Sequence, residues 1–138
     1  MTRPIIYLIE YAVARTIHGV QLVDRSTGQF KTSPTLASGD FKIEKDGGAA
    51  ANLATLPTVV PAAGSSIDIQ LSAAEAQCKQ AVIRGVDAAG AEWDDIVIHL
   101  FTVGNPSAYF PFDMFSATVA LSAASQGAVT GGVWDELV

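Results

Sequence analysis

Short runs in which apolar and polar residues alternate are the feature that most limits the folds open to this chain. Residues 39–45 read GDFKIEK and residues 66–72 read SIDIQLS, so both runs repeat with a period of two. Successive side chains of a β-strand point to opposite faces, and this period therefore indicates strands with one buried face. Asp46-Gly47 directly follows the first run and predicts a tight hairpin turn of type I′.

Further segments with strand character complete the pattern. The runs 5–13 and 95–103 are rich in β-branched and aromatic residues and apolar on both faces, so each requires cover on two sides. Residues 16–24 and 81–86 are shorter candidates, and turn residues such as Asp87-Ala-Ala-Gly90 separate the runs. Strands of this length and spacing predict an all-β fold, namely an antiparallel immunoglobulin-like β-sandwich of about seven strands with extended terminal segments.

A capping-box pattern interrupts the series of strands. Ser72-Ala-Ala-Glu75 places a serine three residues before a glutamate, the arrangement that caps a helix N-terminus. We expect one helical turn that reaches about Cys78 and forms a corner.

The low charge content indicates contacts between subunits. Only 16% of the 138 residues are charged against 49% apolar, which leaves little polar surface to cover a monomer. The net charge is −6 and no cluster of Lys and Arg occurs, so we expect no nucleic-acid partner. No apolar run approaches the length of a membrane span, so we expect no membrane partner, and we read the N-terminal segment as a strand of a chain made in the cytoplasm without export.

The search for catalytic or metal-binding chemistry gives no candidate. His18 and His99 lie inside strands without neighbouring ligands, and Cys78 has no second cysteine to pair with. The acidic run Glu92-Trp-Asp-Asp95 does not have the spacing of a calcium loop. The sequence therefore predicts a protein that is not an enzyme and that has no catalytic residues, no cofactor and no metal.

The segment NPSAYFPFDMF, residues 105–115, concentrates four aromatic rings in a stretch that prolines exclude from regular structure. Together these rings could cover roughly 600 to 1,000 Å², more than a monomer commonly exposes in one patch. Two arrangements would cover these rings. The loop docks on its own sandwich, or it lies on a neighbouring subunit, and the apolar N-terminal strand favours the second.

These observations divide the chain into an N-terminal strand or arm (1–15), a sandwich (16–104), and an aromatic loop with a C-terminal tail (105–138). The apolar residues of the first and third segments are the expected interface. They are Ile5, Ile6, Tyr7, Leu8, Tyr109, Phe110, Phe112, Met114, Phe115 and Trp134.

The stretches QLVDRSTGQFKTSPTLASGDFKIEKDGG, DIQLSAAEAQ, DDIVIHLFTVGNPSAYF and the closing VWDE resemble a recurrent module of tailed-bacteriophage virion proteins. The similarity covers about Val20 to Tyr109 and the last few residues. Such modules are immunoglobulin-like sandwiches in fibres, tail adaptors and head-decoration proteins. In longer relatives VWDE leads into further fibre sequence, whereas here the chain stops at Val138, which favours a short accessory subunit.

The resemblance implies a non-enzymatic structural protein of the virion. Our first hypothesis is a capsid decoration (cement) subunit that forms a homo-oligomer, expected as a trimer, and binds the major capsid protein or tail proteins through its terminal segments. A tail-fibre or tail-adaptor component is the alternative within this class. A host-glycan binding module that uses Trp93 and Tyr109 as a stacking platform is the alternative from another class.

Overall fold

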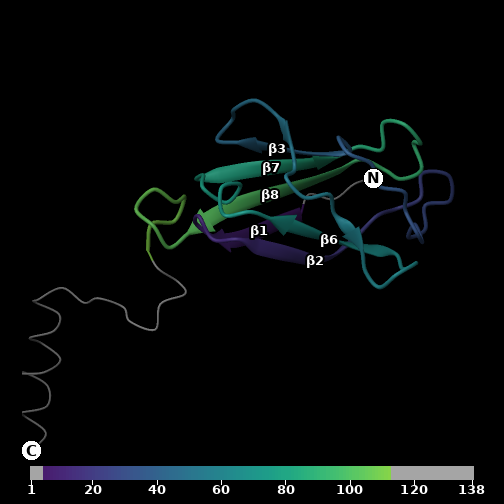
Figure 1. Ribbon diagram of the computed structural model, residues 1–138, viewed down its shortest axis with the longest axis horizontal. Helices are drawn as coiled ribbons and strands as arrows, with labels where there is room; N and C mark the ends of the chain where they lie inside the picture. Colours follow the sequence, from purple (N-terminus) through teal and green to yellow (C-terminus); the bar gives the residue numbers. More distant parts are fainter. Residues whose placement is uncertain (1–4, 113–138) are drawn as a thin grey trace, which may run out of the picture.

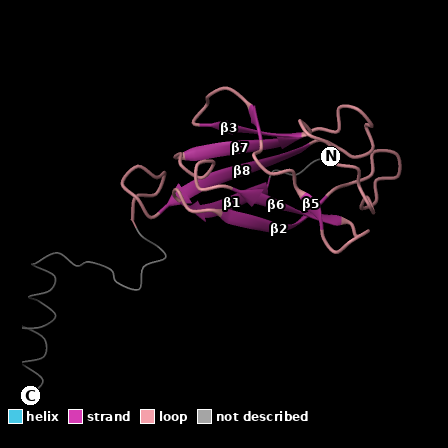
Figure 2. Cartoon of the chain, in the orientation of Figure 1, coloured by secondary structure: helices cyan, strands magenta, loops and turns pink. Residues whose placement is uncertain are grey.

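The structure is a computed structural model that describes residues 5–112 (Figure 1). This part of the chain is all-β, as predicted, and contains eight strands and no helix (Figure 2). The strands are β1 (Ile5–Glu10), β2 (Arg15–Gln21), β3 (Phe41–Lys45), β4 (Ala51–Asn52), β5 (Thr58–Val59), β6 (Ser66–Leu71), β7 (Gln80–Gly85) and β8 (Ile96–Val103).

The strands form two sheets around one core. The larger sheet has the order β1-β8-β7-β3-β4 and the smaller sheet the order β2-β6-β5. All pairs are antiparallel except β1 with β8, which is parallel. Buried residues of both sheets belong to a single hydrophobic cluster, so the sheets pack against each other as a sandwich.

The two-residue period explains which side chains reach the core. In β6, Ile67 and Ile69 are fully buried, whereas Asp68 and Gln70 point to the other face. Burial of each isoleucine side chain contributes about 1.5–3 kcal/mol. The pattern of SIDIQLS therefore fixes the orientation of β6 from local sequence alone.

The hairpin at Asp46-Gly47 has the predicted type I′ character. Both residues have positive φ, 49° for Asp46 and 73° for Gly47, and Gly48 N–H donates to Lys45 O at 2.8 Å. The return strand β4 is only two residues long. Its alanine-rich sequence offers few branched side chains for cross-strand packing, and this is consistent with its short length.

The N-terminal strand is an integral part of the larger sheet. It was expected to run from 5 to 13, but it ends at Glu10 because Ala12, with φ 58°, turns the chain toward β2. All six residues of β1 pair with β8, from Ile5 opposite Ile98 to Glu10 opposite Val103. The sequence analysis had assigned residues 1–15 to an N-terminal strand or arm separate from a sandwich of residues 16–104, whereas β1 is a strand of the larger sheet.

The capping box forms, but the helical turn does not. Ser72 N–H donates to Glu75 Oε1 at 2.9 Å, and Glu75 N–H donates to Ser72 Oγ at 3.1 Å, the two reciprocal bonds of the motif. Only Ala76 N–H then reaches back four residues, and the segment is a turn. The predicted helix was wrong because one such bond does not nucleate a helix.

Candidate interaction surface

The outer face of the larger sheet carries several apolar side chains of β1 and β8, with His99 opposite Ile6 as a polar neighbour. In β1 the residues alternate, so that Ile9 is buried while Ile6 and Leu8 are 65% and 48% exposed. Phe101 in β8 pairs in register with Leu8 and lies on the face opposite the buried Leu100. Strand neighbours on one face are within contact distance of each other, so Leu8 and Phe101 form the centre of an exposed apolar strip.

The loop after β8 folds back onto this strand (Figure 1). Phe110 makes a parallel bridge with Val103: Phe110 N–H donates to Thr102 O at 2.9 Å, and Gly104 N–H donates to Phe110 O at 3.1 Å. Gly104 N–H also reaches Phe112 O at 3.1 Å. The described part of the aromatic segment is therefore fixed to its own subunit through the backbone.

Thr102 is the anchor of this loop. It is fully buried, its hydroxyl donates to the carbonyls of Cys78 and Lys79, and its Oγ1 accepts from Tyr109 N–H at 3.2 Å. A buried hydroxyl requires such partners because an unpaired one would lose its hydration without compensation. Thr102 thus ties the aromatic loop to the start of β7.

The rings of the loop stay accessible although its backbone is docked. Tyr109 packs edge-on against Phe101, with ring centroids 4.9 Å apart, and Phe110 packs edge-on against Tyr109 at 4.8 Å. Tyr109 remains 48% exposed, Phe110 37% and Phe112 65%. The arrangement lies between the two that we expected, because the loop docks in cis but leaves apolar surface for another molecule. We call Ile6, Leu8, Phe101, Tyr109, Phe110 and Phe112 the apolar patch.

The structure divides the predicted interface residues. Ile6 and Leu8 from β1, together with Tyr109, Phe110 and Phe112, lie in the patch, but Ile5 and Tyr7 are partly buried against the core. Met114, Phe115 and Trp134 lie outside the described residues. Phe101 and Thr102 were not singled out from the sequence. The sequence feature that indicates them is the run 95–103, which is apolar on both faces. A strand has this pattern when both of its faces are covered.

Trp93 cannot form the stacking platform that we considered for a glycan. It is fully buried, stacks on Phe41 with ring centroids 5.4 Å apart and donates its Nε1–H to Thr35 O at 3.4 Å. Trp93 precedes β8 and Tyr109 follows it, so the two rings lie at opposite ends of that strand. A sugar-binding platform built from both residues is therefore excluded.

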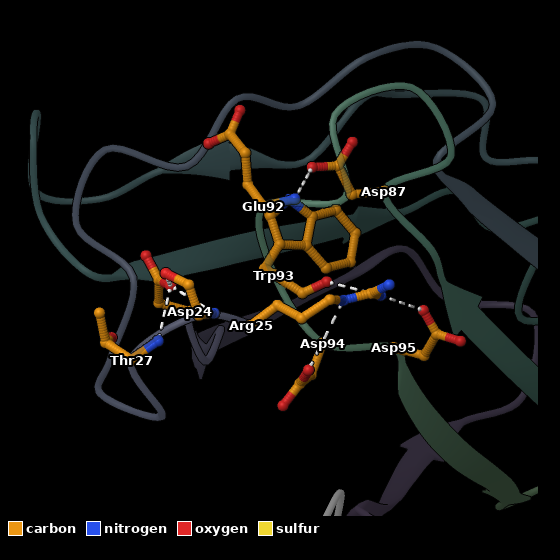
Figure 3. Close-up of polar contacts among 9 residues, drawn as sticks. Asp24, Arg25, Thr27, Asp87, Glu92, Trp93, Asp94 and Asp95 are labelled. Carbon is orange, nitrogen blue, oxygen red and sulfur yellow. Dashed lines mark hydrogen bonds and ion pairs between the residues drawn. The ribbon is translucent and has the colours of Figure 1, made fainter.

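A network of ion pairs surrounds Trp93 at this end of the sandwich (Figure 3). Arg25 donates to Trp93 O and to Asp95 Oδ1, both at 3.1 Å, and lies 3.7 Å from Asp94. Lys31 lies between Asp24 at 3.6 Å and Glu92 at 3.4 Å. Two loops distant in sequence are thereby joined above the tryptophan, which gives the acidic run a structural explanation.

Asp24 organises the turn after β2. Its Oδ1 accepts from the Ser26 hydroxyl at 2.6 Å and from the backbone N–H groups of Ser26 and Thr27. These bonds, chiefly those from Ser26, lower the pKa of Asp24 to about 2, with a minor contribution from Lys31. The predicted turn at Asp24-Arg-Ser-Thr-Gly28 is thus stabilised by a carboxylate.

His18 and Cys78 have structural explanations, and His99 lies on the outer side of β8 opposite Ile6. His18 Nδ1 lies 2.8 Å from Asp68 Oδ2, and the hydrogen bond from His18 lowers the pKa of that carboxyl. Cys78 is buried, and this burial raises the pKa of its thiol. Between residues 5 and 112, no group of three or more metal-ligating side chains is placed to bind a metal ion.

An open groove of about 430 Å³ lies between the β3–β4 hairpin and the Ser72–Glu75 turn. Its two charged side chains already have structural partners: Lys45 donates to Ala74 O at 2.8 Å, and Glu75 accepts from Ser72 and Ala54. The groove therefore offers small apolar side chains and no unused charge to a ligand.

No family model, no curated protein and no solved structure matches this chain. Within the described residues, no helix is long and apolar enough to cross a membrane.

Proposed function

We propose that this protein is a non-enzymatic structural subunit of a bacteriophage virion, with capsid decoration as the leading role. The proposal rests on the apolar patch, in which Ile6 and Phe112 are each 65% exposed on a sheet and loop fixed by backbone hydrogen bonds. A rigid exposed apolar surface is what a subunit needs to bind neighbours without chemistry. The phage context comes from the resemblance of the sequence stretches described above.

The strand order supports an immunoglobulin-like sandwich. In such folds the third, sixth and seventh lettered strands (C, F, G) share one sheet, variable types add C′ to it, and B, E and D lie in the other. β3, β7, β8 and β4 correspond to C, F, G and C′, while β2, β6 and β5 correspond to B, E and D. The chain departs from that pattern in one respect, because β1 pairs with β8 and not with β2.

The proposal locates binding at one end of the larger sheet. β1 and β8 run parallel, so the loop after β8 and the end of β1 lie at the same end of the sheet. The patch extends from there along the outer face. A capsid or tail protein that contacts this surface would cover Tyr109 and Phe110 together, since their rings are already in contact.

The test uses particles of the encoding phage from which the gene has been deleted. Purified protein added back should sediment with the particles, and the variant Phe110→Ser/Phe112→Ser should not, while its circular dichroism stays unchanged. Phe30→Ser is the matched control, because Phe30 is 57% exposed but lies outside the patch. Binding by the double variant at the level of the wild type would contradict the proposal.

Imaging of the reconstituted particles separates the two structural roles. Density on the head supports capsid decoration, whereas density on the tail supports the fibre or adaptor alternative.

A further inference from the structure

Four strand edges terminate the two sheets in the described part of the chain, at β1, β4, β2 and β5. An edge exposes unpaired backbone N–H and C=O groups that can pair with another chain, and proteins usually protect such edges by short length, charge, proline or a bulge. The four edges of this sandwich differ in that protection.

Three edges are protected. β4 and β5 are two residues long, which leaves little backbone to pair with. β2 has seven residues, but its register shifts between Ile17 and Val20, and it contains Arg15 and His18. A bulge twists the edge, and charged side chains disfavour pairing with another strand.

The β1 edge has none of these devices. Its six residues pair with β8 in one uninterrupted register, and the run from Ile5 to Ile9 contains no charge and no proline. Ile6 and Leu8 are exposed beside this edge. A long, regular and apolar edge of this kind is a template for strand addition.

The backbone direction shows which groups are available. Tyr11 N–H donates to Val103 O of β8, and a strand directs the N–H and C=O of alternate residues to opposite sides. The odd-numbered residues of β1 therefore bond to β8. The N–H and C=O groups of Ile6 and Leu8 point away from β8, and within residues 5–112 no strand pairs with them. The Glu10 carbonyl also points away from β8 but accepts from Val13 N–H at 3.4 Å.

We propose that the β1 edge pairs with β1 of a second copy of this chain, antiparallel and about a two-fold axis, so that two larger sheets become one continuous sheet. A two-fold contact requires a self-complementary surface. With Tyr7 on the axis, Ile6 of each copy faces Leu8 of the other, and the two Glu10 side chains are not opposite each other. The uncharged run thus pairs with itself without like-charge repulsion.

This pairing goes beyond the proposed function and also enlarges the surface on which that function depends. Directly opposite residues in an antiparallel pair point to the same face. Ile6 and Leu8 of both copies therefore lie together on the outer face, and the two apolar patches become neighbours. The resulting assembly is a dimer, whereas the resemblance suggested a trimer.

Sedimentation equilibrium of the full chain over about 1 to 100 μM tests the proposal. We expect a species of twice the 14.4 kDa chain mass at the upper end of this range. Leu8→Pro removes an edge-facing N–H but no bond to β8, so it should weaken association at least about tenfold. Ile6→Lys, which changes only an exposed side chain, should act in the same direction if Leu8→Pro impairs folding.

Hydrogen exchange distinguishes the occupants of the edge. The amides of Ile6 and Leu8 should gain protection as the concentration rises. Protection at every concentration in a monomer would show that another part of the chain covers the edge, and the absence of protection throughout would show that nothing does. Either result overturns the proposal, as would a stable trimer.

The Phe110→Ser/Phe112→Ser variant keeps the two proposals separable. It should remain a dimer through β1 while losing particle binding. A wild-type chain that is monomeric at all concentrations but still binds particles through the patch would refute the edge pairing and leave the proposed function standing.

Discussion

At the scale of single residues, burial decides what each aromatic side chain does. Trp93 and Tyr109 are similar in character in the sequence, and both were candidates for a binding platform. The structure buries Trp93 between Phe41 and two loops joined by Arg25, whereas Tyr109 lies on the surface against Phe101. One residue therefore stabilises the fold and the other is available to a partner.

This difference predicts opposite mutational results. Trp93→Ala should lower the free energy of unfolding by about 3–5 kcal/mol, because a large buried side chain leaves a cavity. Tyr109→Ala should lower the free energy of unfolding by only about 1 kcal/mol, which is the contribution of one contact between partly exposed rings. Urea denaturation of both variants measures this, and equal losses would contradict the assignment.

The carboxylate of Asp24 predicts a pH-dependent stability. Its pKa in the folded protein is lowered from 3.8 to about 2, so the ionised form is favoured by the native turn. Its contribution is fully present above about pH 4 and is lost as the pH falls through about 2. Asp24→Ala should therefore reduce stability at neutral pH, and the gap to wild type should close over that acidic range.

Denaturant titrations at several pH values check this prediction. Ser26→Ala serves as the companion variant, since the Ser26 hydroxyl is the largest cause of the lowered pKa. It should reproduce part of the loss with the same pH profile. A gap that persisted unchanged below pH 2 would mean that the charge of Asp24 is not responsible.

At the scale of strands, the β3–β4 hairpin is specified by local sequence, whereas the parallel pairing of β1 with β8 is not. The β3–β4 turn follows from Asp46-Gly47 because both residues tolerate positive φ. The pairing of β1 with β8 joins residues more than ninety positions apart, from Ile5 opposite Ile98 to Glu10 opposite Val103. No local signal specifies such a partner.

Gly47 offers a test of the local rule. Its φ is 73°, and no heavy atom lies within 4 Å of the position that an alanine Cβ would occupy, so Gly47→Ala would introduce backbone strain without a steric clash. We expect a loss of about 1 kcal/mol, the cost of a left-handed conformation for an ordinary residue. Thermal unfolding measures it, and unchanged stability would argue against a type I′ turn.

At the scale of the whole molecule, charge and apolar surface are unevenly distributed. The outer residues of β2 and β6 include His18, Asp68 and Gln70, so the smaller sheet presents a polar face. The apolar patch lies on the larger sheet, and the unprotected β1 edge adjoins it. The rest of the outer face of the larger sheet is not apolar, because Lys42 and Glu44 of β3 and Arg84 of β7 lie on it.

The sequence by itself determined the longer strands, their inward faces and the hairpin turn, because a period of two and the tolerance of Asp46-Gly47 for positive φ are properties of adjacent residues. It also indicated that residues 5–13 and 95–103 needed cover. It did not indicate the short strand β5 (Thr58–Val59). Tertiary structure alone decided that the first of these strands pairs in parallel with β8, that Trp93 is buried, and that Tyr109 and Phe110 dock by their backbone while their rings stay exposed. These outcomes depend on contacts between segments that are distant in sequence, and a pattern of adjacent residues does not specify such contacts.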